Sequence, residues 1–127
     1  MRSRGLVVGV VAVAGVLAAA TPIAAKDGDV LVRGTCTNAS TSKLKLSEED
    51  GRIEVEFEVD QNRSGVRWSV TLRRATTVLL RTTRVTRAPS GSFEVRRVVA
   101  DLAGSDRISA RATSPSGEVC RVTATFR

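Results

Sequence analysis

Arginine is the residue type that gives this chain most of its capacity for specific chemistry. The 127-residue sequence contains 17 arginines and 3 lysines against 13 acidic residues. Residues 26–60 hold 5 basic and 9 acidic residues, whereas residues 61–127 hold 13 basic and 4 acidic residues. The excess of arginine over lysine is typical of a GC-rich genome, but codon usage does not explain why the positive charge is concentrated in one half. Such asymmetry indicates an anionic partner.

Five of these arginines form a candidate anion-binding set, namely Arg67, Arg73, Arg107, Arg111 and Arg121. We expect Arg111 and Arg121 to face each other across a β-hairpin, where like charges are mildly destabilising. If strand 65–73 lies beside strand 106–113, as in an immunoglobulin-like sandwich, Arg67 and Arg73 join the same outer face. Arginine forks between serine and threonine hydroxyls suit carboxylate or phosphate groups. The alternative is a solvated and screened surface, and a register slip of one residue would bury these arginines.

Other residue types exclude several kinds of catalysis. The sequence has no histidine and no tyrosine, which excludes Ser–His and Cys–His nucleophile pairs and histidine metal sites. Glu54, Glu56 and Glu58 recur about 7 Å apart along one strand face, as a carboxylate-pair hydrolase would need. We expect them to face water beside lysines, without an exposed aromatic ring to hold a sugar. The acidic turn at residues 48–50 lacks the alternating spacing of a calcium loop. We therefore predict no catalytic residue, no metal site and no cofactor.

The two cysteines and the single tryptophan have structural interpretations. Cys36 and Cys120 share the inward parity of the apolar residues around them, so we predict a disulfide between the terminal strands. Closing a loop of this length stabilises a fold by about 4–5 kcal/mol in the chain-entropy model. A reactive or intermolecular thiol is the alternative, but no CxxC spacing supports it. Trp68 is in phase with Val66 and Val70, which predicts a core residue facing small side chains such as Ala110.

These residues need strands to position them. After residue 25 the chain alternates apolar and polar residues with a period of two, and it has no convincing helical stripe. We predict an all-β, immunoglobulin-like antiparallel β-sandwich of about 7–8 strands, forming a single domain over residues 26–127. The expected strands are 29–36, 43–47, 52–60, 65–73, 78–86, 92–99, 106–113 and 118–126. Two places fit poorly: a bulge or strand end is expected near Arg96 and Arg97, and residues 74–77 make a weak turn sequence.

Two hairpins can be registered from their turns. Residues 48–51 read as a four-residue loop ending in glycine, which would place Lys45 opposite Glu54 and Lys43 opposite Glu56.

The second hairpin has a three-residue loop, Pro115-Ser116-Gly117, with proline suited to the first turn position and glycine to a left-handed one. This loop pairs Ser114 with Glu118. It therefore brings Arg111 opposite Arg121 on the outer face.

The N-terminal 25 residues indicate export. Arg2 and Arg4 precede an uncharged run rich in alanine, valine and glycine, and small residues at positions 23–25 suit cleavage before Lys26. This is the layout of a secretory signal peptide, which places the remaining chain in an oxidising compartment. A retained membrane anchor is the alternative, because the uncharged run is long enough to span a bilayer. We predict a secreted or cell-envelope-associated domain without a transmembrane span in the mature chain.

Several segments carry a resemblance over most of residues 34–126. They are GTC near residue 34, IEVEFEVDQNR at 53–63, PSGSFEVRR at 89–97 and GEVCR at 117–121. The chain resembles small, uncharacterised exported β-sandwich proteins of high-GC Gram-positive bacteria, of the actinobacterial type. The resemblance implies a shared sandwich of unknown role and supplies no catalytic residue. The chain departs from it at residues 74–77, where a glycine-containing turn is expected.

Two hypotheses about function follow. The first is a non-enzymatic binding domain that engages an anionic envelope polymer or an acidic protein through the five arginines. Nucleic acid is a poor candidate, because no aromatic residues are interleaved with the basic ones. The alternative is a structural or assembly subunit that adds an edge strand to a partner. An enzyme ranks third.

Overall fold

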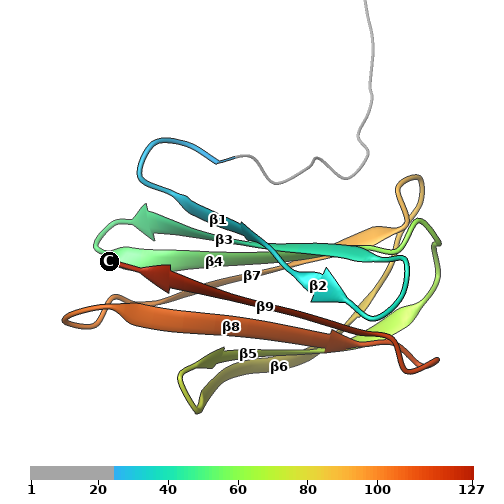
Figure 1. Ribbon diagram of the computed structural model, residues 1–127. Helices are drawn as coiled ribbons and strands as arrows, with labels where there is room; N and C mark the ends of the chain where they lie inside the picture. Colours follow the sequence, from blue (N-terminus) through green and yellow to red (C-terminus); the bar gives the residue numbers. More distant parts are fainter. Residues whose placement is uncertain (1–24) are drawn as a thin grey trace, which may run out of the picture.

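The computed structural model describes residues 25–127, so residues 1–24 of the predicted signal peptide lie outside it. Two antiparallel sheets stack as layers (Figure 1). The four-stranded sheet has, in spatial order, β1 (Val30–Arg33), β3 (Thr41–Glu49), β4 (Arg52–Asp60) and β7 (Ser92–Ala100). The five-stranded sheet has β2 (Thr35–Cys36), β9 (Val119–Phe126), β8 (Asp106–Thr113), β5 (Arg67–Arg74) and β6 (Thr77–Val85). The predicted all-β sandwich is confirmed.

The strand neighbours that matter for the arginines are present. β5 lies beside β8, as the immunoglobulin-like arrangement requires, and β8 pairs with β9. In the other sheet, β3 and β4 are hairpin neighbours, whereas a constant-type immunoglobulin sheet places its second strand beside its fifth. The architecture is therefore a sandwich with a strand order of its own.

The predicted strand 29–36 is divided between the two sheets. β1 pairs with β3, and β2 pairs with β9. Gly34 lies between β1 and β2, where a Cβ atom would be 2.3 Å from the Ser42 Oγ and 2.5 Å from the Arg121 carbonyl oxygen. Only glycine fits this passage, so the change of sheet depends on it.

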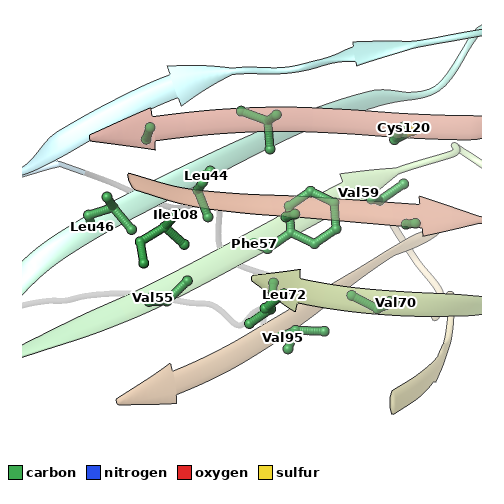
Figure 2. Packing of buried hydrophobic residues seen from close by; sticks show 14 of the residues in the cluster. Leu44, Leu46, Val55, Phe57, Val59, Val70, Leu72, Val95, Ile108 and Cys120 are labelled. Carbon is green, nitrogen blue, oxygen red and sulfur yellow. The ribbon is translucent and has the colours of Figure 1, made fainter. Parts of the chain in front are cut away.

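The core lies between the sheets and contains the inward side chains of both (Figure 2). Its largest fully buried residues include Trp68, Phe57 and Leu44. The Trp68 ring lies 6.0 Å from the Phe93 ring, centroid to centroid, and its Nε1 donates a 3.1 Å hydrogen bond to Oε1 of Gln61. Trp68 is therefore a core residue, as predicted, and its polar atom is satisfied at the core boundary.

The hairpin between β3 and β4 differs from its prediction. Its loop has two residues, Asp50 and Gly51, and both have positive φ (50° and 77°), as a type I′ turn requires. Glu49 pairs with Arg52, so residues 48 and 49 belong to the strand. The prediction of a four-residue loop was wrong, because the tighter turn lets residues 48 and 49 pair with β4. The register moves by two residues, which preserves the inward and outward faces.

β7 also differs from its prediction. It runs unbroken to Ala100, and its ladder with β4 has no register shift, so the bulge expected near Arg96 and Arg97 is wrong. Arg97 does occupy an inward position opposite Val55, but its side chain is exposed. β7 is an edge strand, so the side chain can reach solvent around the edge. Residues 101–105 form an irregular crossing from β7 to β8 in the other sheet.

A disulfide joins Cys36 to Cys120, as predicted. The two residues are direct partners on β2 and β9, so the bond lies within one sheet. Disulfides persist in oxidising compartments. The residues described contain no helix long and apolar enough to cross a bilayer.

Candidate anion-binding face

The β8–β9 hairpin has the register predicted from its loop. The Ser114 amide donates a 2.9 Å hydrogen bond to the Glu118 carbonyl oxygen, and Gly117 has a φ of 95°. Arg111 consequently lies directly opposite Arg121. Both arginines are exposed, while their neighbours along each strand are buried. Two like charges therefore face each other on the outer surface of the five-stranded sheet.

β5 adds two further arginines to this surface. Thr71 lies opposite Arg111, and Arg73 lies opposite Ser109. Arg67 shares the outward parity of these two β5 residues and is exposed, whereas Arg73 is half-buried.

Arg107 completes the candidate set from β8, two residues before Ser109 on the same face. The structure thus brings all five sequence-selected arginines to one surface.

A sixth arginine belongs to the same surface and was missed from the sequence. Residues 75–76 form a two-residue loop, and Ala75 adopts a φ of 49° in the absence of glycine. A bulge then shifts the β5–β6 ladder between Leu72 and Arg73, leaving Leu79 as the extra residue. The shift places Arg81 outward, opposite Thr71; without it Arg81 would point inward. Arg81 could not be assigned to this face from the sequence, because the turn sequence does not predict a bulge.

The arginine face is the name used below for this outer surface of the five-stranded sheet, with Arg67, Arg73, Arg81, Arg107, Arg111 and Arg121. Most outward positions between the arginines carry hydroxyl side chains, and Val78 and Val85 are exposed apolar residues at the β6 edge. The hydroxyl residues include Ser69, Thr71, Ser109, Thr113, Thr123 and Thr125. The outward positions of β5, β6, β8 and β9 include no acidic residue. Within residues 25–127, none of the six arginines forms an ion pair. The face is therefore a cationic surface whose charges lack internal counter-ions.

The outer surface of the four-stranded sheet has the opposite character. The Lys45 Nζ lies 2.8 Å from the Glu56 Oε1, and the Lys43 Nζ lies 3.7 Å from the Glu58 Oε1. Glu54 also has a cationic partner, since Arg96 contacts both Glu54 and Glu49. Each of the three glutamates considered for hydrolysis is thus held in an ion pair. We call this surface the paired face.

One carboxyl group on the paired face has an altered pKa. Partial burial raises the pKa of Glu94 to about 7, and a hydrogen bond with Glu56 and the negative charges of Glu56 and Glu58 add to the rise. Lys45 acts in the opposite direction. Glu94 lies directly across the β4–β7 ladder from Glu58. Sequence reasoning missed it because β4 and β7 are neighbours only in the folded sheet.

A hollow of about 340 Å³ opens on the arginine face, lined by Ala75, Thr76, Arg107, Ser109 and Thr123. The β5–β6 turn forms its rim, because the Ala75 amide donates a 3.0 Å hydrogen bond to the Arg107 carbonyl oxygen. Ser109 and Thr123 are direct partners across β8 and β9 and form its floor. The lining provides one guanidinium and three hydroxyls, and no carboxylate.

Glu118 is a buried carboxylate that the sequence did not single out. Its oxygens accept hydrogen bonds from the backbone amides of Asn38 and Ser40, both at 3.1 Å, and from the Ser40 hydroxyl at 2.8 Å. With Cys36 and Cys120 it forms the one cluster in the described part of the chain whose ligand-type atoms lie within 4.8 Å of one another. The sulfurs are joined in the disulfide, so this cluster fastens the loop between β2 and β3 to β9.

Comparison of the chain with protein-family models, with curated proteins and with solved structures gives no match. The resemblance to actinobacterial exported proteins stays a prediction, and function has to be inferred from the two outer faces of the sandwich.

Proposed function

We propose that the protein is an exported, non-enzymatic binding domain whose arginine face engages an anionic polymer of the cell envelope or an acidic protein. The observation that carries this proposal is the set of six arginines on one face that form no ion pair within residues 25–127 and share that face with hydroxyls and with no acidic side chain. Guanidinium groups without an ion-pair partner in the fold are available for bidentate pairing with an external anion.

The spacing of the arginines suits a ligand with repeated charges. Arg111 and Arg121 are cross-strand neighbours about 5 Å apart at Cβ, and Arg81 lies two strands from Arg111, about 10 Å away. A single small anion would meet one or two of these guanidinium groups. An extended polyanion could meet several at once, and the separate weak contacts would then add to a useful affinity.

The aromatic residues support a ligand other than nucleic acid. Phe57, Phe93, Phe126 and Trp68 are the only aromatic residues in the chain, and all four are buried. The arginine face therefore has no ring on which a base could stack, and stacking supplies much of the affinity for single strands.

The edges of the sheets do not favour the alternative of assembly through an added strand. β1 and β2 are short edges of four and two residues. The long edges β6 and β7 each carry an arginine at an inward position, Arg84 opposite Trp68 and Arg97 opposite Val55. Short edges, bulges and inward charges are devices that prevent edge-to-edge pairing.

Binding to immobilised polyphosphate and poly-glutamate, measured over a salt series, tests the proposal. The protein is produced by exporting the full chain, so that the disulfide forms. We expect retention that weakens at least about tenfold between ~50 and ~300 mM salt. Arg111→Ala with Arg121→Ala should lower the affinity about tenfold further, because two charge-assisted contacts are lost.

Arg33→Ala with Arg52→Ala is the matched control. Both of these arginines are exposed on the four-stranded sheet, and the double variant loses the same net charge. It should bind nearly as well as the parent. Salt-insensitive retention, or equal losses in the two double variants, would contradict the proposal.

A further inference from the structure

The hollow beside the β5–β6 turn makes part of the arginine face more selective than an open charged surface. Arg107 supplies the cation at its wall, and Arg73 lies on β5 directly opposite Ser109 of the floor. Thr76 on the rim and Ser109 and Thr123 on the floor add three hydroxyl donors from three different segments of the chain. Donors are thus arranged around a concave space, whereas the Arg111 and Arg121 pair stands on a flat ladder.

The shape and number of these donors identify the chemistry that fits them. A carboxylate is planar, so all its acceptor sites lie close to one plane, and donors that surround it from several sides cannot all reach them. A phosphate or sulfate ester presents three or four oxygens in a tetrahedral arrangement, and can accept bonds from a fork and from hydroxyls on other sides. The volume of about 340 Å³ lies at the small end of the range of ligand sites, about 300–1,000 Å³. It has room for one such group and part of the unit that carries it.

We infer that the hollow lined by Thr76, Arg107, Ser109 and Thr123 is a subsite for a tetrahedral oxyanion ester, so that the ligand is a phosphorylated or sulfated polymer rather than an acidic protein. This inference rests on the proposed function and narrows its ligand class. The remaining arginines of the face supply long-range attraction to any polyanion. The hollow supplies the discrimination between tetrahedral and planar anions.

The test compares three polymers at equal charge concentration and ionic strength: polyphosphate, dextran sulfate and poly-glutamate. Ser109→Ala with Thr123→Val removes two floor hydroxyls while keeping every charge. We expect about tenfold weaker binding of polyphosphate, of dextran sulfate or of both, with unchanged binding of poly-glutamate. A loss confined to one of the two polymers identifies phosphate or sulfate as the group that the hollow prefers.

The matched control is Ser69→Ala with Thr113→Val, which removes a directly opposed Ser–Thr pair from the same face outside the hollow. It should change the three affinities by one and the same small factor, because these hydroxyls lie on the open face and do not distinguish tetrahedral from planar anions. Thr76→Ala, at an exposed rim position, provides a second variant if the double substitution impairs folding, and should weaken the same polymers by a smaller factor.

The outcomes separate the two proposals. Equal effects of the floor and control variants, or an equal loss of all three polymers, would overturn the subsite while salt-dependent binding by the parent still supports the arginine face. A parent protein that binds none of the three polymers at low salt would overturn both.

Discussion

The two outer faces of this sandwich use charged side chains in opposite ways: the paired face combines acidic with basic residues, whereas the charged residues of the arginine face are all basic. On the paired face, Lys45 lies directly opposite Glu56 at 2.8 Å and Lys43 lies directly opposite Glu58, although Glu58 also faces Glu94 across its other ladder. On the arginine face, the corresponding cross-strand position holds Arg111 against Arg121. Opposite charges across a ladder contribute roughly 0.2–1 kcal/mol, and like charges cost stability. The ion pairs of the paired face therefore stabilise the fold, whereas the like charges of the arginine face destabilise it, and a bound anion would offset that cost.

The largest expected effect on stability concerns the disulfide that joins β2 to β9 in the sheet of the arginine face. Replacing Cys36 and Cys120 by serine should lower the free energy of unfolding by about 4–5 kcal/mol, because the bond closes a loop with a sequence separation of 84. Urea denaturation of the exported parent and the double variant measures this difference. A loss below about 1 kcal/mol would contradict this prediction and would show that β2 stays paired with β9 without the disulfide.

The next effect concerns Glu118, a carboxylate buried directly before β9. Glu118→Gln should cost about 1.5–3 kcal/mol, because a charged acceptor of three hydrogen bonds is replaced by a neutral amide that also carries donors. Thermal unfolding at neutral pH checks the loss. Asp27→Asn, at an exposed position, is the control and should be close to neutral.

A smaller effect distinguishes the paired face by its pH dependence. Glu94 has a pKa of about 7 in the folded protein against 4.5 as its ordinary value, so between these pH values the folded state binds more protons than the unfolded state. The stability contributed by protonated Glu94 is present below pH 4.5 and is lost as the pH rises through about 7. Glu94→Gln should therefore match the parent at low pH and exceed it at pH 8 by no more than about 1 kcal/mol, since the site is partly exposed.

Unfolding curves at pH 4.5, 6 and 8 check this sign. Because Glu56, Glu58 and Lys45 remain in both proteins, the difference between them isolates Glu94. A variant that is less stable than the parent at pH 8 would mean that ionised Glu94 is favourably paired.

The smallest effect tests the cost of the arginine face directly. Arg121→Thr removes the charge opposite Arg111 and introduces a good strand former. It should raise the free energy of unfolding by a few tenths of a kcal/mol at low salt, and the gain should shrink at ~1 M salt as the repulsion is screened. Arg52→Thr on the other sheet should show no comparable salt-dependent gain.

The sequence predicted the elements where local chemistry determines the geometry. The Pro115-Ser116-Gly117 loop permits one register, so the Arg111–Arg121 pair followed from it. Asp50-Gly51 permits a tighter turn than expected, and the register there was displaced by two residues. The error left the faces intact because strand parity repeats every two residues.

The missed features depend on contacts between distant segments. Position 34 requires glycine because Ser42 and Arg121 crowd it, and the local sequence pattern does not reveal either neighbour. Arg81 reaches the arginine face through a bulge, and the Glu94 pKa depends on the pairing of β4 with β7. Such features are set by the assembled sheets rather than by propensity.

The most direct test of the central claim is a map of where a polyanion touches the protein. Exported ¹⁵N-labelled protein is titrated with short polyphosphate at low salt, and backbone amide shifts are followed by NMR. Shifts concentrated on β5, β8 and β9, with β3, β4 and β7 unaffected, are the predicted result. Shifts centred on the four-stranded sheet, or none at low salt, would contradict the assignment of binding to the arginine face.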